Sequence, residues 1–210
     1  MLIELAKYFF LLFVVIEPVS LVPMFAALTA DGDAKYRRRV AWKASLVSTA
    51  ILIAFALGGQ LLLSYLGISV AAFKIGGGVL LLLLSIDMVF ARRSGIRSTT
   101  VREQDEARLR EDISVFPLAF PLIAGPGAMA TLVLIAAEVS GDPMMLAGLI
   151  GIVLALMIIV LGLLMLAGPV MKVLGVTGAN MVSRLSGVIL VALAIQYLVD
   201  GIKAAFHLPL

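Results

Sequence analysis

The sequence predicts an all-α membrane protein of six transmembrane helices, arranged as a 3+3 inverted repeat. The membrane assignment follows from composition: 62% of the 210 residues are hydrophobic and only 14% are charged, whereas a soluble domain has about 25% charged residues. The repeat follows from proline pairs at matching places in the two halves of the chain. These pairs predict that helices one and four are broken by proline and glycine near the bilayer midplane.

Apolar runs of about 20 residues are long enough to cross the hydrocarbon core of a bilayer. The chain has six such runs, at residues 3–28, 42–66, 68–91, 114–138, 144–168 and 176–202. We therefore expect a first three-helix repeat at 1–91, a charged cytoplasmic linker at 92–113 and a second three-helix repeat at 114–210. Because three spans are an odd number, the second repeat would enter the membrane from the opposite face.

Basic residues predict the orientation. They gather in the loop after the first run, at Lys35, Arg37, Arg38, Arg39 and Lys43, and again in the linker. Positively charged loops stay in the cytoplasm, so we expect a multi-pass protein of the inner (plasma) membrane with both termini outside. The net charge of +3 is too small and scattered to indicate nucleic acid as a partner.

Prolines mark the first and fourth runs. Each run contains two prolines five positions apart, Pro18 and Pro23 in the first and Pro121 and Pro126 in the fourth, and glycines flank Pro126. Each proline removes a backbone donor and clashes with the preceding turn, so both helices should be interrupted there. Weaker echoes between the halves support a repeat: LGIS at 66–69 matches LGVT at 174–177, and GVLL at 78–81 matches GVIL at 187–190. The predicted broken-helix positions are Pro18, Pro23, Pro121, Gly125, Pro126 and Gly127.

Glu17 lies about 14 residues into the first helix, which places it near the midplane at 1.5 Å per residue. A carboxylate at that depth is costly unless it is neutralised, paired or in contact with water. It is either a group that binds a substrate ammonium or a coupling proton, or half of a structural ion pair. Ser20 and Thr131 are short polar side chains that would line a cavity beside it.

Lys74 and Arg184 are the cations expected to be buried in the third and sixth runs, and we expect them to approach the membrane centre from opposite faces. Three roles are open for them. They would receive a substrate carboxylate, neutralise Glu17, or extend to the interface as long basic side chains do.

Signatures of catalysis are missing from the sequence, which has no nucleophile elbow, zinc-protease motif, P-loop or dinucleotide fingerprint. With one histidine and no cysteine, a transition-metal site is not expected. We therefore expect neither an enzyme nor a cofactor.

Four segments together are similar to the MarC family of bacterial and archaeal membrane proteins: 17–29 (EPVSLVPMFAALT), 73–90, 117–131 (PLAFPLIAGPGAMAT) and 184–202. The resemblance implies six spanning helices and a relation to proteins described as neutral amino-acid transporters. It also shows a departure in the first helix. Family members commonly have Asp-Pro or Asn-Pro followed by x-Gly-Asn-x-Pro, whereas here Glu17 fills the acidic place and Ser20 and Leu21 replace Gly and Asn.

The leading hypothesis is a secondary transporter of small neutral or zwitterionic, amino-acid-like solutes, with the direction of transport open. Its expected partners are the lipid bilayer, the solute and, if transport is coupled, protons; a homo-oligomer is compatible with the sequence. The two alternatives are a passive channel and a membrane scaffold that transports nothing.

Overall fold

The computed structural model describes residues 1–90 and 112–206, and these residues form helices and turns without any strand. Most of the predicted linker at 92–113 lies outside the described residues. The helical elements are α1 (Leu2–Ile16), α2 (Pro18–Leu28), α3 (Ala34–Tyr65), α4 (Val70–Val89), η1 (Ser114–Ile123), α6 (Pro126–Glu138), α7 (Pro143–Met165) and α8 (Ala167–Phe206).

Five helical segments of the described chain are long and apolar enough to cross a membrane: α1 with α2, α3, α4, α7 and α8. A sixth span results when η1 and α6, which meet at a bend of 57°, are counted as one. The described chain therefore has the composition and helix lengths of an all-α membrane protein.

Polar side chains begin the unbroken spans. The carboxylate of Asp33 accepts from the Tyr36 N–H at 2.6 Å at the start of α3, and Ser69 accepts from the Ala72 N–H at 3.1 Å at the start of α4. Asp142 does the same for α7, with Pro143 in the first helical position. Such caps satisfy backbone donors that have no acceptor within the helix.

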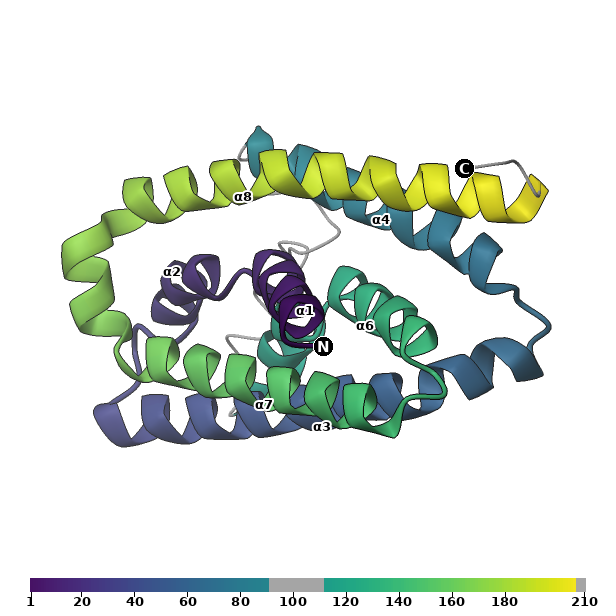
Figure 1. Cartoon of the computed structure of the whole chain (residues 1–210). Helices are drawn as coiled ribbons and strands as arrows, with labels where there is room; N and C mark the ends of the chain where they lie inside the picture. The colour runs from purple at the N-terminus through teal and green to yellow at the C-terminus, as the bar shows by residue number, and fades with distance from the viewer. Residues whose placement is uncertain (91–111, 207–210) are drawn as a thin grey trace.

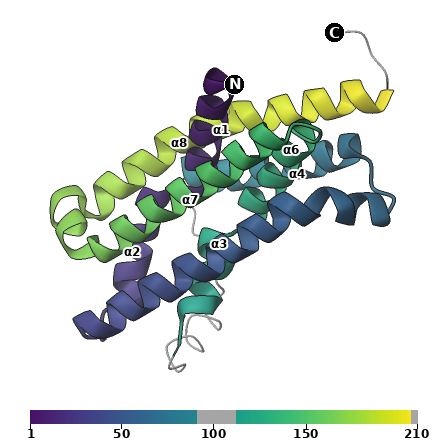
Figure 2. The same ribbon diagram turned by 60° about the horizontal axis from the view of Figure 1, so that its bottom comes forward.

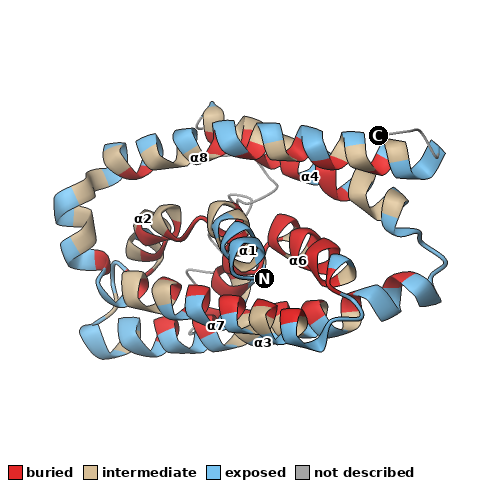
Figure 3. Ribbon diagram, viewed as in Figure 1, coloured by how far each residue is buried: buried red, intermediate tan, exposed pale blue. Residues whose placement is uncertain are grey.

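The interrupted helices lie in the middle of the molecule. Figure 1 shows α1, α2 and α6 between two pairs of longer helices, α4 with α8 and α3 with α7. Burial follows the same arrangement, because α6 is enclosed along most of its length while the long helices bury only one side (Figure 3). Turning the molecule shows α3 and α7 passing in front of these central segments (Figure 2). The longer helices therefore flank the two proline-rich segments (Figure 1).

Glycines bring α4 and α8 into close contact. A methyl group built on Gly78 of α4 would lie 2.9 Å from Cγ of Leu198, and one built on Gly187 of α8 would lie 3.0 Å from the backbone nitrogen of Val89. Small residues allow helices to approach in this way where no hydrophobic force from water drives them together. Since higher numbers on one helix meet lower numbers on the other, the pair is antiparallel.

A glycine with a positive φ angle precedes the last helix of each predicted repeat. Gly67, between α3 and α4, has φ of 69°, and Gly175, inside α8, has φ of 61° and bends that helix. L-residues with a side chain rarely adopt such angles. The segment of α8 that follows the bend begins at Val176, where the sixth apolar run was predicted to begin.

Candidate functional site

The first span is interrupted at Glu17. Helix α1 ends at Ile16, Glu17 adopts left-handed angles of φ 55° and ψ 59°, and α2 starts with Pro18 in its first position. Proline disfavours a right-handed helical residue before it and needs no acceptor for an N–H at a helix start. A residue with a side chain pays about 1–3 kcal/mol for such a backbone, a strain that clusters at functional positions.

The side chain of Glu17 is buried, with 4% of the residue exposed. Its carboxylate accepts a hydrogen bond from the hydroxyl of Ser20, which occupies the third position of α2. The carboxylate therefore lies over the first turn of α2, where the aligned backbone dipoles favour a negative charge. Pro23, in contrast, lies inside α2 and does not interrupt it.

The fourth span is interrupted between Ile123 and Pro126. Phe116 and Phe120 have extended angles within η1 and precede the cis prolines Pro117 and Pro121. After Ala124, Gly125 forms the N-cap of α6, whose first residue is Pro126. No side chain caps this helix start.

Gly125 lies against backbone rather than side chains. A methyl group at this position would lie 2.7 Å from the carbonyl oxygen of Pro121, a contact that real Cβ atoms essentially never make. The chain therefore needs glycine here in order to turn from η1 into α6.

The two interruptions lie next to each other. A methyl group on Gly127, in the first turn of α6, would lie 3.8 Å from Cγ1 of Val15, which is two residues before Glu17. It would also contact Leu81 and Leu84 of α4. We call residues 17–20 together with residues 124–127 the helix-break region. This region contains the first turns of α2 and α6, and such turns present N–H groups to an anion.

Thr131 lies one helical turn beyond Gly127 on α6. It is 0% exposed, and its hydroxyl has no hydrogen-bond partner among the described residues. A buried hydroxyl without a partner costs free energy. Thr131, which the sequence predicted to line a cavity beside Glu17, therefore lies on an enclosed face of α6.

Lys74 does not reach the helix-break region. Its ammonium group lies 3.1 Å from the carboxylate of Glu138, at the far end of α6. Glu138 is eleven residues beyond Gly127, or roughly 16 Å along the helix. Of the three roles left open for Lys74, the structure shows pairing, with an acid other than Glu17.

Arg184 also lies away from the break. The prediction that it is buried is wrong, because its side chain is exposed on α8. It precedes Gly187, which packs against Met88 and Val89 at the end of α4, whereas Lys74 is near the start of α4. The two cations therefore lie at opposite ends of the α4–α8 pair.

Sequence reasoning missed Glu138. Besides pairing with Lys74, this carboxylate acts electrostatically on the hydroxyls of Tyr8 in α1 and Tyr197 in α8. Its position in the sequence could have marked it as a candidate for an ion pair, because Glu138 is the only acid in the fourth apolar run and immediately precedes the turn to the fifth. Its partners come from three other helices, so no sequence pattern could have named them.

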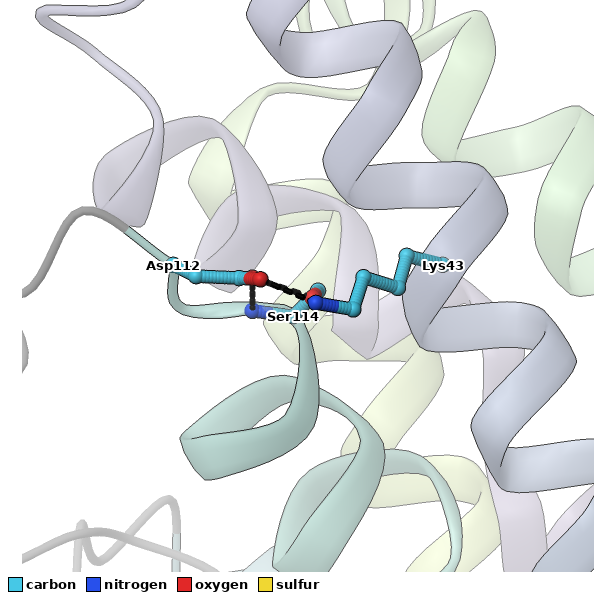
Figure 4. A network of polar contacts seen from close by, with 3 residues as sticks. All are labelled: Lys43, Asp112 and Ser114. Atoms are coloured by element: carbon cyan, nitrogen blue, oxygen red, sulfur yellow. Dashed lines mark hydrogen bonds and ion pairs between the residues drawn. The ribbon is translucent and has the colours of Figure 1, made fainter.

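A second missed contact joins Lys43 of α3 to Asp112, just before η1. Figure 4 shows the Lys43 ammonium and the Ser114 hydroxyl and N–H converging on this carboxylate. The hydrogen bond from Lys43, followed by those from Ser114, lowers the pKa of Asp112 to about 2. Lys43 was expected only to mark the cytoplasmic side.

Comparison with known proteins gives a consistent set of relatives. The family model described as MarC family integral membrane protein matches residues 2–206. A UPF0056 membrane protein of Methanocaldococcus jannaschii is 40% identical over 206 residues, covering 95% of this chain and 98% of the relative. The UPF0056 membrane protein YhcE of Escherichia coli is 32% identical, with 95% and 92% covered. No solved structure matches the chain.

Proposed function

Because the chain belongs to the MarC family of integral membrane proteins, we propose that it is a secondary transporter of small neutral or zwitterionic, amino-acid-like solutes. One observation carries the proposal: two half-helices, α2 and α6, start on prolines inside the first and fourth spans, and these spans meet beside Val15 and Gly127. Half-helix starts of this kind form substrate sites in secondary transporters. Transport requires neither a catalytic group nor a cofactor.

The charges in the helix-break region support the binding of a zwitterion. The first turns of α2 and α6 offer N–H groups and the positive ends of two helix dipoles to a carboxylate. Glu17 offers a negative charge to an ammonium group or to a coupling proton, and Ser20 and Thr131 add hydroxyls.

Three pairs of matching features support the inverted repeat. Pro18 and Pro126 each begin a half-helix, and Gly67 and Gly175 each have positive φ. The sequence separation is the same in both pairs. In this alignment of the two halves Pro18 corresponds to Pro126. The spacing of the prolines alone had suggested a different alignment, in which Pro18 corresponds to Pro121 and Pro23 to Pro126.

The third pair concerns contacts. Gly78 packs against Leu198, and Gly187 packs against Val89. The separation from Gly78 to Gly187 equals that from Val89 to Leu198, so each contact is the image of the other under exchange of the halves. Reciprocal contacts of this kind are the mark of a two-fold axis, here between α4 and α8.

In this proposal both breaks lie near the midplane of the inner (plasma) membrane. The basic loops face the cytoplasm, and the termini lie outside. Alternating access comes from movement of one repeat against the other around the fixed site. Proton coupling would act through Glu17.

Counterflow in proteoliposomes tests the proposal, using a mixed panel of neutral amino acids and three proteins: unmodified, Glu17→Gln and the matched control Glu4→Gln. Saturable counterflow by the unmodified protein and the control supports a carrier. Loss of a charge-assisted contact should lower the Glu17→Gln rate about tenfold or more.

Other results would contradict the proposal in different ways. Unsaturable conductance would indicate a channel, and absence of any flux a scaffold. If Glu17→Gln transports normally with an unchanged pH dependence, Glu17 binds neither ammonium nor proton.

A further inference from the structure

Two ion pairs join the halves of the described chain. Lys43 of α3 pairs with Asp112, and Lys74 of α4 pairs with Glu138 at 3.1 Å. In both, the base belongs to the first half and the acid lies at one end of the fourth span, Asp112 just before η1 and Glu138 at the end of α6. The remaining ion pair among these residues, between the N-terminal amine and Glu4, is local.

The two acids bracket the bend of the fourth span. Asp112 immediately precedes η1 and Glu138 is the last residue of α6, so the 57° bend lies between them. The bases come from helices on opposite sides of the central segments, α3 below and α4 above in Figure 1. Each end of the fourth span is therefore tied to a different flanking helix.

Both pairs are suited to reversible opening. The side chain of Asp112 is 47% exposed and that of Glu138 is 42% exposed, and partly hydrated ion pairs contribute little stability. They nevertheless select one arrangement of two elements over another, because the charges attract only when the elements are close. The Lys74 pair also lies beside Tyr8 of α1 and Tyr197 of α8, so helices of the first and last spans adjoin that end.

We propose that these ion pairs are the two latches of the transporter. The Lys74–Glu138 pair closes the end where α6 finishes, and the Lys43–Asp112 pair closes the end where η1 begins. Opening one pair while the other holds would tilt the fourth span and expose the helix-break region to one face at a time. This inference rests on the proposed transport function.

A single thiol can report on each latch, because the chain has no cysteine. Thr131→Cys places that thiol beside the break, and it breaks no hydrogen bond with the described residues. The thiol is labelled with a membrane-impermeant maleimide, applied separately to each face of oriented vesicles. The labelling rate is compared in backgrounds carrying Lys74→Gln or Lys43→Gln.

Loss of one latch should raise the labelling rate about two- to fivefold, the population change expected when a partly exposed ion pair is removed. Lys74→Gln should do so from the face where α6 ends, and Lys43→Gln from the opposite face. The exchange Lys74→Glu with Glu138→Lys should restore the original rate. Two controls, Lys35→Gln on α3 and Asp200→Asn on α8, remove charges that do not join the halves and should leave the rate unchanged.

An unchanged rate in both latch variants would overturn the proposal, as would an equal rise from both faces, which indicates loosened packing. Failure of the exchange variant to restore the rate would do the same. The outcome is separable from that of the transport test. If counterflow occurs but the labelling rate does not depend on the ion pairs, only the latch proposal is rejected. If labelling rises from one face but no counterflow occurs, the proposed class of solute is rejected and the latches are not.

Discussion

Glu17 is buried at the start of α2, whereas Asp112 is half exposed beside Lys43. Both acids lie just before the start of a helix, α2 for Glu17 and η1 for Asp112, yet their partners differ. Glu17 accepts from Ser20 three residues on, a contact made possible by the local turn. Asp112 accepts from a lysine on another helix as well as from its neighbour Ser114, and this combination holds its pKa near 2.

The low pKa of Asp112 predicts how stability depends on pH. Its folded-state value of about 2 lies below the usual 3.8, so its contribution is present in full above about pH 4 and is lost as the pH falls through 2. Asp112→Asn should therefore lower the free energy of unfolding by about 0.5–1 kcal/mol at pH 7, discounted for solvent exposure. The difference from unmodified protein should shrink on acidification below pH 4. Thermal unfolding in detergent at several pH values measures it, and equal stability at pH 7 would contradict the ion pair.

At the scale of the element, the start of α6 depends on the backbone of the residues before it. Proline at its first position needs no hydrogen-bond acceptor, and Gly125 fits against the Pro121 carbonyl where no side chain can. Helix α2 starts on Pro18 by the same rule. Proline thus begins a helix in both spans, although the sequence alone does not show which proline of each pair will do so.

Gly125→Ala should destabilise the protein by about 1–3 kcal/mol, because the new methyl group meets backbone that cannot move without displacing η1. The matched control is Gly162→Ala in α7, where a methyl group meets nothing within 4 Å. That change should be neutral or stabilise by up to about 1 kcal/mol, since alanine loses less backbone entropy in a helix. Denaturant unfolding in detergent compares the two, and a stable Gly125→Ala protein would contradict the close contact.

At the scale of the molecule, the bent pair of η1 and α6 can cross the membrane or enter and leave on one side. The repeat requires it to cross. The central place of α6 between the long helices fits a full span, since a lipid-exposed break would leave backbone groups without partners.

Topology labelling decides this point. Single cysteines replace Lys35, Ile68 or Ser140, and an impermeant thiol reagent is applied to oriented vesicles. Six spans place positions 68 and 140 on one face and position 35 on the other. Labelling of position 140 on the same face as position 35 would show a re-entrant segment and would remove the basis for the repeat.

Several features of the chain were set by local sequence. The apolar runs predicted the spans because length and hydropathy alone determine which segments fit the bilayer. The clustered prolines predicted an interruption within the first and fourth runs but not the residue at which it falls, because the lost donor and the steric clash act within one turn of each proline.

Only the tertiary structure decided which distant side chains meet. Lys74 found Glu138 rather than Glu17, and Lys43 found Asp112, because the positions of α3 and α4 around the fourth span place those charges together. The reciprocal packing of Gly78 and Gly187 also depends on how two antiparallel helices cross. A sequence records how the chain behaves over a few residues, whereas these contacts join segments more than sixty residues apart and arise from the packing of the whole chain.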